Sequence, residues 1–157
     1  MRYRLPLIAL VVAAVWIAAA SPARAQEGAG VRAGVSGDPT QFFFGGHVET
    51  APLVERLRFR PNVEIGLGDH RTLVALNVEF AWHFSDSRRG WSPYAGAGPA
   101  VNFIVHDDHP GRDGSDVGGG LNFFVGLEHA GGLFTELKVG AIDSPSVKFA
   151  VGYVFGR

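Results

Sequence analysis

Apolar and polar side chains alternate along the chain after residue 26, and this period of two continues nearly to the last residue. The clearest example is Thr72–Phe84, in which Val74 and Leu76 stand on one parity and Asn77 and Glu79 on the other. Successive side chains of an extended strand point to opposite faces of a sheet. The pattern therefore predicts strands that have one apolar and one polar face, rather than helices.

Clusters of Gly, Pro, Asp and Ser interrupt the alternation at short intervals, as turns do. They separate eight predicted strands: about Gly28–Ser36, Gln41–Thr50, Leu57–Asp69, Thr72–Phe84, Ser92–Val105, Val117–Glu128, Leu133–Ile142 and Ser146–Phe155. Short turns pair neighbouring strands antiparallel, and an even number of strands can close into a barrel without exposed edges. Strands of about ten residues, tilted by about 45°, also span the hydrocarbon core of a bilayer. We predict an all-β, eight-stranded antiparallel up-and-down transmembrane β-barrel that occupies residues 26–157 as one domain.

The alternation alone does not tell which face is wet, because a soluble lipocalin-like barrel shows the same pattern with the faces exchanged. Side-chain volume distinguishes the two. The interior of an eight-stranded barrel is just wide enough to be filled by side chains. The aromatic residues of the apolar face would overfill that interior. They are Phe42, Phe44, Phe59, Phe80, Trp82, Phe84, Phe103, Phe123, Phe149, Tyr153 and Phe155. We therefore expect this face to contact lipid, where a closed barrel also satisfies the backbone hydrogen bonds.

The polar face is dominated by Gly, Ala and Asn, and its five basic and five acidic residues cancel in charge. A buried charge is tolerated only when it is paired and hydrogen-bonded. The balance therefore favours an enclosed polar lumen over a solvated sheet face with scattered charges. The predicted polar network of the lumen is Arg32, Glu49, Arg58, Arg60, Glu64, Asn77, Glu79, Asn122, Glu128, Glu136, Lys138 and Lys148.

The first 25 residues have the organisation of a secretory signal peptide. Arg2 and Arg4 form a positive start, Leu5–Ala20 is an uncharged apolar run, and Ala23-Arg24-Ala25 is an A-x-A cleavage site. We expect residues 1–25 to be removed. A retained anchor is the alternative, but the apolar run of 16 residues is shorter than the roughly 17–25 residues of a spanning helix.

Charge and cysteine content narrow the class of protein further. Removal of residues 1–25 takes away three of the 14 basic residues and leaves 11 against 15 acidic ones, a net charge of −4. This is not the basic footprint of a nucleic-acid-binding protein. The chain has no cysteine, so neither a disulfide framework nor a lipidated N-terminal cysteine is available.

Two neighbouring segments resemble a known family. LNVEFAWHF at residues 76–84, a polar turn, and WSPYAGAGPAV at residues 91–101 are similar to the strand pair L-N-x-x-Y-x-F … P-Y-x-G-x-G of the small outer-membrane β-barrel domain family of Gram-negative bacteria, which contains the opacity-type and outer-membrane-protein-A-like barrels. The resemblance implies location in the outer membrane, with outer-membrane lipid and lipopolysaccharide as surroundings. It also implies that the barrel-assembly machinery is a partner during biogenesis. In the family this machinery reads a terminal aromatic residue, whereas here Phe155 stands two residues before the end.

The resemblance further implies an orientation, with the N-terminus in the periplasm. The expected exterior loops are then Gly37–Thr40, Gly68–Arg71, His106–Asp116 and Asp143–Pro145, and the expected periplasmic turns lie near Pro52, Arg88 and Gly131. Near one membrane interface an aromatic girdle is expected, formed by Trp82, Phe84, Trp91 and Tyr153.

Two groups of residues have side chains that could carry chemistry. His83 and Ser85 form an H-x-S pair comparable to that of the outer-membrane lipid A deacylases, since a His beside a Ser is the minimum for a nucleophilic hydroxyl. The Ser-Asn-Ala-Gly continuation of that family is missing, so we interpret the pair as a lumen His next to a turn Ser. The loop His106–Asp116 collects His and Asp residues that could bind a divalent cation, but it has no diagnostic ligand spacing and equally suits a solvated loop.

The sequence thus predicts no catalytic, cofactor-binding or metal site. The function it favours is that of a non-enzymatic integral outer-membrane protein with a role in envelope structure or surface interaction. A wide pore is not expected at eight strands. Two alternatives stay open: an outer-membrane lipid-modifying enzyme and a secreted soluble ligand-binding barrel.

Overall fold

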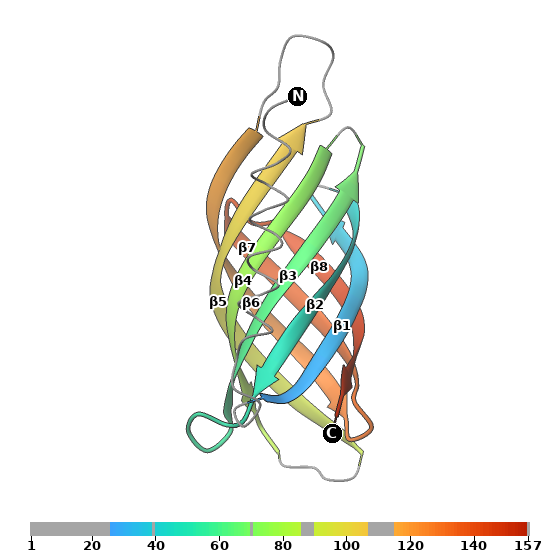
Figure 1. Cartoon of the computed structure of the whole chain (residues 1–157), viewed down its shortest axis with the longest axis vertical. Helices are drawn as coiled ribbons and strands as arrows, with labels where there is room; N and C mark the ends of the chain where they lie inside the picture. Colours follow the sequence, from blue (N-terminus) through green and yellow to red (C-terminus); the bar gives the residue numbers. More distant parts are fainter. Residues whose placement is uncertain (1–25, 39, 70, 86–89, 107–114, 157) are drawn as a thin grey trace.

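The computed structural model describes residues 26–38, 40–69, 71–85, 90–106 and 115–156, and its regular elements are eight strands (Figure 1). They are β1 (Gln26–Gly37), β2 (Gln41–Thr50), β3 (Leu57–Gly68), β4 (Arg71–His83), β5 (Trp91–His106), β6 (Ser115–His129), β7 (Leu133–Ile142) and β8 (Val147–Phe155). Each end lies within two residues of the predicted one. The predicted all-β class and strand number are confirmed.

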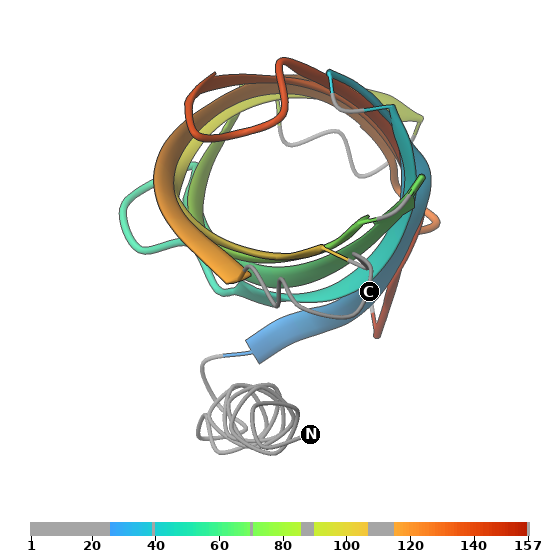
Figure 2. The same ribbon diagram turned by 90° about the horizontal axis from the view of Figure 1, so that it is seen from above.

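The sheet closes on itself. Every strand pairs antiparallel with its neighbour in sequence, and β8 returns to pair with β1 from Ala29 opposite Phe155 to Gly37 opposite Val147. Figure 2 shows the resulting ring of strands from above. Closure leaves no unpaired sheet edge, which would otherwise be a template for aggregation. The up-and-down topology predicted from the short turns is therefore confirmed.

The two ends of the barrel differ in what they carry. β1 begins and β8 ends at the same end, where Ala29 is opposite Phe155; we call this the terminus end. β1, β3, β5 and β7 end at the opposite end, where β2, β4, β6 and β8 begin; we call this the loop end (Figure 1).

The alternation of side chains sorts them into an apolar outside and a polar inside. In β4, Glu79 is 0% exposed, whereas its neighbour Phe80 is 39% exposed. In β3, Arg60 is 2% exposed. The same inversion holds around the barrel, where the exposed large apolar side chains include Val35, Phe42, Phe44, Trp82, Val101, Phe123, Val125, Leu137, Phe149 and Val151. The interior is therefore polar. Sequence alternation alone leaves open whether the interior is apolar or polar.

Two of the sequence predictions lie wholly or largely outside the described residues. These are the signal peptide at residues 1–25 and the cation-binding loop considered at residues 106–116, of which residues 107–114 are not described. Within the described part of the chain, no helix is long and apolar enough to cross a membrane, a result that has no bearing on strands.

Candidate functional site: the polar lumen

All twelve residues of the predicted network belong to strands and point into the lumen. Eleven are at most 4% exposed, namely Arg32, Glu49, Arg60, Glu64, Asn77, Glu79, Asn122, Glu128, Glu136, Lys138 and Lys148. The twelfth, Arg58, has 19% of its side chain exposed. A charged side chain is almost never fully buried without a partner, so their contacts decide whether the arrangement is stable.

Glu136 of β7 is the acceptor on which a first group of these residues converges. Arg32 Nη1 donates to Glu136 Oε1 over 3.2 Å, and Arg60 Nη2 donates to Oε2 over 3.1 Å. The Tyr94 hydroxyl also donates to Oε2, over 2.9 Å. One carboxylate thus ties β1, β3, β5 and β7 together across the lumen.

Two lysines complete this group. Lys138 Nζ lies 2.5 Å from Glu79 Oε1 and 3.2 Å from Glu64 Oε1, and Lys148 Nζ lies 2.7 Å from Glu64 Oε2. We call the whole set the central cluster: Arg32, Arg60, Glu64, Glu79, Glu136, Lys138 and Lys148. It holds four cations against three carboxylates. Removal of one of the three carboxylates would leave buried cations uncompensated, which is the costly way to alter a buried ion pair.

A second group lies nearer the terminus end. Arg58 Nη1 donates to Glu49 Oε1 over 3.2 Å, and His83 Nε2 lies 3.6 Å from the same oxygen. Glu128 adds a second carboxylate to this group. Three atoms lie within 4.8 Å of one another: a carboxylate oxygen of Glu128, a carboxylate oxygen of Glu49 and a ring nitrogen of His83. We call Glu49, Arg58, His83 and Glu128 the terminal cluster.

The terminal cluster supplies the donors that could hold a metal ion. Two carboxylates and an imidazole form a donor set that divalent transition metals accept. However, the Arg58 guanidinium already bonds to Glu49. The terminal cluster has one carboxylate more than it has guanidinium groups, and the central cluster has one cation in excess. The charges of the five acidic and five basic residues in the lumen therefore balance without a metal ion.

Three asparagines form a hydrogen-bonded row across the lumen. Asn122 Nδ2 donates to Asn77 Oδ1 over 2.8 Å, and Asn77 Nδ2 donates to Asn62 Oδ1 over 2.7 Å. Asn62 in turn donates to the carbonyl of Arg60 over 3.3 Å. Asn62 was not among the residues predicted for the network, although its parity in β3 places it on the polar face.

His83 and Ser85 do not share the geometry of a catalytic pair on the outer face. The His83 ring is buried in the lumen and stacks on Tyr94 at a centroid distance of 5.4 Å. The Ser85 hydroxyl is 2.8 Å from the Ser92 hydroxyl, which also lies 2.6 Å from the Ser85 carbonyl. These contacts support the interpretation of a lumen His beside a turn Ser.

The lumen also contains aromatic rings that sequence reasoning did not assign to the network. Tyr94, Phe124 and Phe134 are at most 2% exposed, and the Arg60 guanidinium carbon lies 5.1–5.6 Å from all three ring centroids. Attraction of a cation to a ring face is strongest where water is excluded.

Each ring lies on a glycine of the adjacent strand, which leaves space for it. Tyr94 is opposite Gly126, Phe124 is opposite Gly96, and Phe134 is opposite Gly152. A Cβ atom at any of these glycines would collide with the ring. The parity of the three rings in their strands is the sequence signal that places them on the polar face, whereas their pairing with glycines requires the strand register.

Comparison with known proteins supports the fold. No family model matches the chain, and no curated protein matches it. Among solved structures, the N-terminal β-barrel domain of Pseudomonas aeruginosa OprF is 16% identical with a TM-score of 0.62, covering 83% of this chain and 99% of that one. Neisserial surface protein A (NspA) is 13% identical with a TM-score of 0.55, covering 81% of this chain and 90% of that one. The outer membrane enzyme PagL is 13% identical with a TM-score of 0.51, covering 81% of this chain and 97% of that one.

At these identities the likeness concerns the fold alone. The chain is an eight-stranded barrel of the kind found among outer-membrane proteins of Gram-negative bacteria, as the sequence resemblance implied. The same fold carries a protein described as an enzyme, PagL, so it does not by itself decide between a structural and a catalytic role.

Proposed function

We propose that this protein is a non-enzymatic integral protein of the bacterial outer membrane, with a lumen closed by its own ion pairs and a role in envelope structure or surface interaction. The observation that carries the proposal is the inversion of the barrel: apolar side chains such as Phe123 and Leu137 are 51% and 45% exposed, whereas Glu79 and Glu136 are at most 1% exposed. Such a surface is stable in lipid and would aggregate in water.

The contents of the lumen support a structural role rather than a wide channel. The central cluster links side chains of β1, β3, β4, β7 and β8 across the interior, and the rings of Tyr94, Phe124 and Phe134 fill the space beside it. Eight strands enclose an interior that side chains can fill. We infer that ions and solutes do not pass freely through the closed network.

The orientation that we propose is supported by the family resemblance, which implies a periplasmic N-terminus, and by the topology, in which β1 begins and β8 ends at the same end of the barrel. With both strand termini on the periplasmic side, the loop end faces outward. Outer-membrane lipid and lipopolysaccharide then surround the apolar face, and the barrel-assembly machinery handles the chain during biogenesis.

Cell fractionation and heat-modifiable gel migration test the proposal. The protein should appear in the outer-membrane fraction, resist extraction with carbonate, and migrate faster before boiling than after it, since a closed barrel stays folded in cold detergent. Release by carbonate would contradict membrane insertion and would favour the secreted soluble barrel.

A lipid-modifying enzyme is the second candidate, because His83 and Ser85 form an H-x-S pair and PagL, an outer membrane enzyme, has the same fold. The residues that could act, His83 and Ser85, engage Tyr94 and Ser92 instead. We expect lipid A acylation in a defined strain to be the same with the native chain and with His83→Ala. A change in acylation that depends on His83 would overturn the non-enzymatic assignment.

A further inference from the structure

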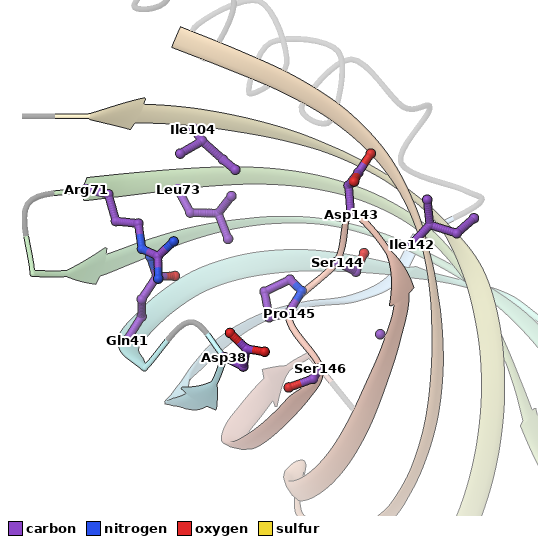
Figure 3. A pocket seen from close by; sticks show the side chains of 11 residues that line it. Asp38, Gln41, Arg71, Leu73, Ile104, Ile142, Asp143, Ser144, Pro145 and Ser146 are labelled. Carbon is purple, nitrogen blue, oxygen red and sulfur yellow. The ribbon is translucent and has the colours of Figure 1, made fainter. Parts of the chain in front are cut away.

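The loop end of the lumen holds a cavity that is separate from both charge clusters. Its volume is about 320 Å³, which lies at the lower end of the range of small-molecule sites, roughly 300–1,000 Å³. Leu73, Ile104 and Pro145 give it an apolar wall (Figure 3). Polar or charged side chains of β2, β4, the β1–β2 connection and the β7–β8 connection complete the lining. The cavity therefore has the mixed lining of a binding site.

One side of the cavity presents hydrogen-bond donors. Gln41 of β2 and Arg71 of β4 are both opposite Gly68 of β3, so no side chain separates them, and Figure 3 shows them together. Gln41 is 4% exposed, and its Nε2 is buried with no hydrogen-bond partner among the described residues. A buried donor without an acceptor destabilises the protein. An acceptor in the cavity would remove that cost.

Other parts of the lining present carboxylates. Asp38 and Asp143 are exposed and line the same space, with Asp143 on the side of Figure 3 away from Arg71. Within the described part of the chain, no ion pair joins Arg71 to either of them. Charges of opposite sign thus surround one cavity without meeting, which leaves room for a molecule that carries both.

The wall formed by the β7–β8 connection is fixed in place. Asn102 Nδ2 donates to the Asp143 carbonyl over 2.6 Å, and the Ser146 backbone N–H donates to the Asp38 carbonyl over 3.2 Å. Ile142, which leads into the connection, has φ of 64°, a conformation that β-branched residues rarely adopt. Such a conformation persists where the surroundings hold it, and this occurs often at ligand sites. Because the wall is already ordered, binding costs little further entropy.

We propose that this cavity binds a small zwitterionic solute, with its carboxylate or phosphate group against Gln41 and Arg71 and its ammonium group facing Asp38 and Asp143. An anion alone would be repelled by the two carboxylates. A cation alone would leave Gln41 Nε2 without an acceptor. The proposal concerns the loop end only and does not depend on the role assigned to the lumen.

Nuclear magnetic resonance of the ¹⁵N-labelled protein in a non-ionic detergent tests the proposal. Glycine and O-phosphoethanolamine are the zwitterionic probes; acetate, inorganic phosphate and ethanolamine carry only one of the two charges. We expect a zwitterion to shift the Gln41 side-chain amide and the Gly140 and Ser144 backbone amides saturably, and each singly charged probe to bind about ten-fold more weakly or worse. A preference for glycine identifies a free amino acid as the ligand type, and one for O-phosphoethanolamine identifies a headgroup. Absence of a saturable shift, or equal binding of acetate, inorganic phosphate or ethanolamine, would overturn the proposal.

Variants locate the site. Gln41→Leu removes the buried donor, and Asp143→Asn removes one carboxylate; each should weaken binding of the preferred zwitterion about ten-fold. Asp116→Asn, an exposed position of β6 outside the lining, is the matched control and should bind as the native protein does. Asp143 is exposed, so its variant keeps the test open even where Gln41→Leu fails to fold. Native affinity in a folded Asp143→Asn protein would contradict the site.

Discussion

At the scale of single residues, Glu136 is the group on which the lumen depends most. Its two oxygens accept hydrogen bonds from Arg32, Arg60 and the Tyr94 hydroxyl, and Lys138 Nζ lies 3.8 Å away. Arg32, Arg60 and Lys138 are each at most 2% exposed, so water does not compensate their charges when the Glu136 charge is removed. The free energy of unfolding should therefore respond strongly to a change that removes only the charge of Glu136.

Glu136→Gln keeps the shape of the side chain and removes the charge. We expect it to lower the free energy of unfolding by about 3–5 kcal/mol, because it leaves buried cations uncompensated. Urea unfolding in lipid vesicles measures this. Glu55→Gln, at an exposed position, is the control and should change stability by no more than about 0.5 kcal/mol. Similar midpoints for the two variants would mean that water reaches Glu136.

The aromatic rings of the lumen depend in turn on the glycines that they cover. Gly126 lies under Tyr94, and a Cβ atom there would meet both the ring and the backbone carbonyl of Thr135. Gly119, in the same strand, has no atom within 4 Å of a built Cβ. Alanine at Gly126 changes both side-chain packing and strand propensity, whereas alanine at Gly119 changes strand propensity alone. Comparison of the two variants therefore isolates the effect of packing on stability.

We predict that Gly126→Ala destabilises the barrel by about 1–3 kcal/mol through overpacking. Gly119→Ala should be neutral or slightly stabilising, because alanine narrows the unfolded ensemble. Unfolding of the two variants side by side in the same vesicles measures the difference. Equal stabilities would show that Tyr94 moves aside at no cost.

At the scale of elements, each strand has one face toward lipid and one toward the lumen. The free-energy cost of a charged side chain on the lipid face should depend on its depth in the bilayer. Leu76 lies near the middle of β4, and Val147 lies at the start of β8. Both point outward. The bilayer is least polar at its midplane, so the same charged side chain should be tolerated differently at the two positions.

Leu76→Arg should cost about 2–4 kcal/mol, and Val147→Arg about 0–1 kcal/mol, as expected for the midplane and an interface. Folding yield and urea unfolding in vesicles give both values. If Leu76→Arg folds and unfolds like the native chain, Leu76 does not face lipid.

The strands and their faces could be predicted from sequence, because a period of two is a local property. Every strand end was placed within two residues, and the parity that puts Glu79 inside and Phe80 outside is visible in the chain. Which charges meet could not be predicted. Arg32 and Glu136 are far apart in sequence, and their contact depends on register and on closure. Phe124 and Phe134 have the parity of Glu128 and Glu136, which places their rings on the polar face. How they pack could not be predicted, since the glycines that make room for them belong to neighbouring strands.

At the scale of the whole molecule, the closure of the sheet and the inversion of its faces, with apolar side chains outside and charged ones inside, depend on each other. The closed sheet removes exposed edges and pairs its backbone groups, so a surface of apolar side chains can face lipid. The same closure takes five acidic and five basic side chains out of water, which their balance in number allows. Neither half of the arrangement would be stable alone.

Spin labels placed on the barrel in lipid vesicles test this inversion most directly. The chain has no cysteine, so single cysteines can be introduced at the outward positions Val101 and Val125 and at the Asp69 turn. We predict that labels at Val101 and Val125 collide often with dissolved oxygen and rarely with a water-soluble nickel chelate, and that the label at Asp69 shows the reverse. Frequent collisions with nickel at Val101 and Val125 would place the apolar face in water and contradict the account.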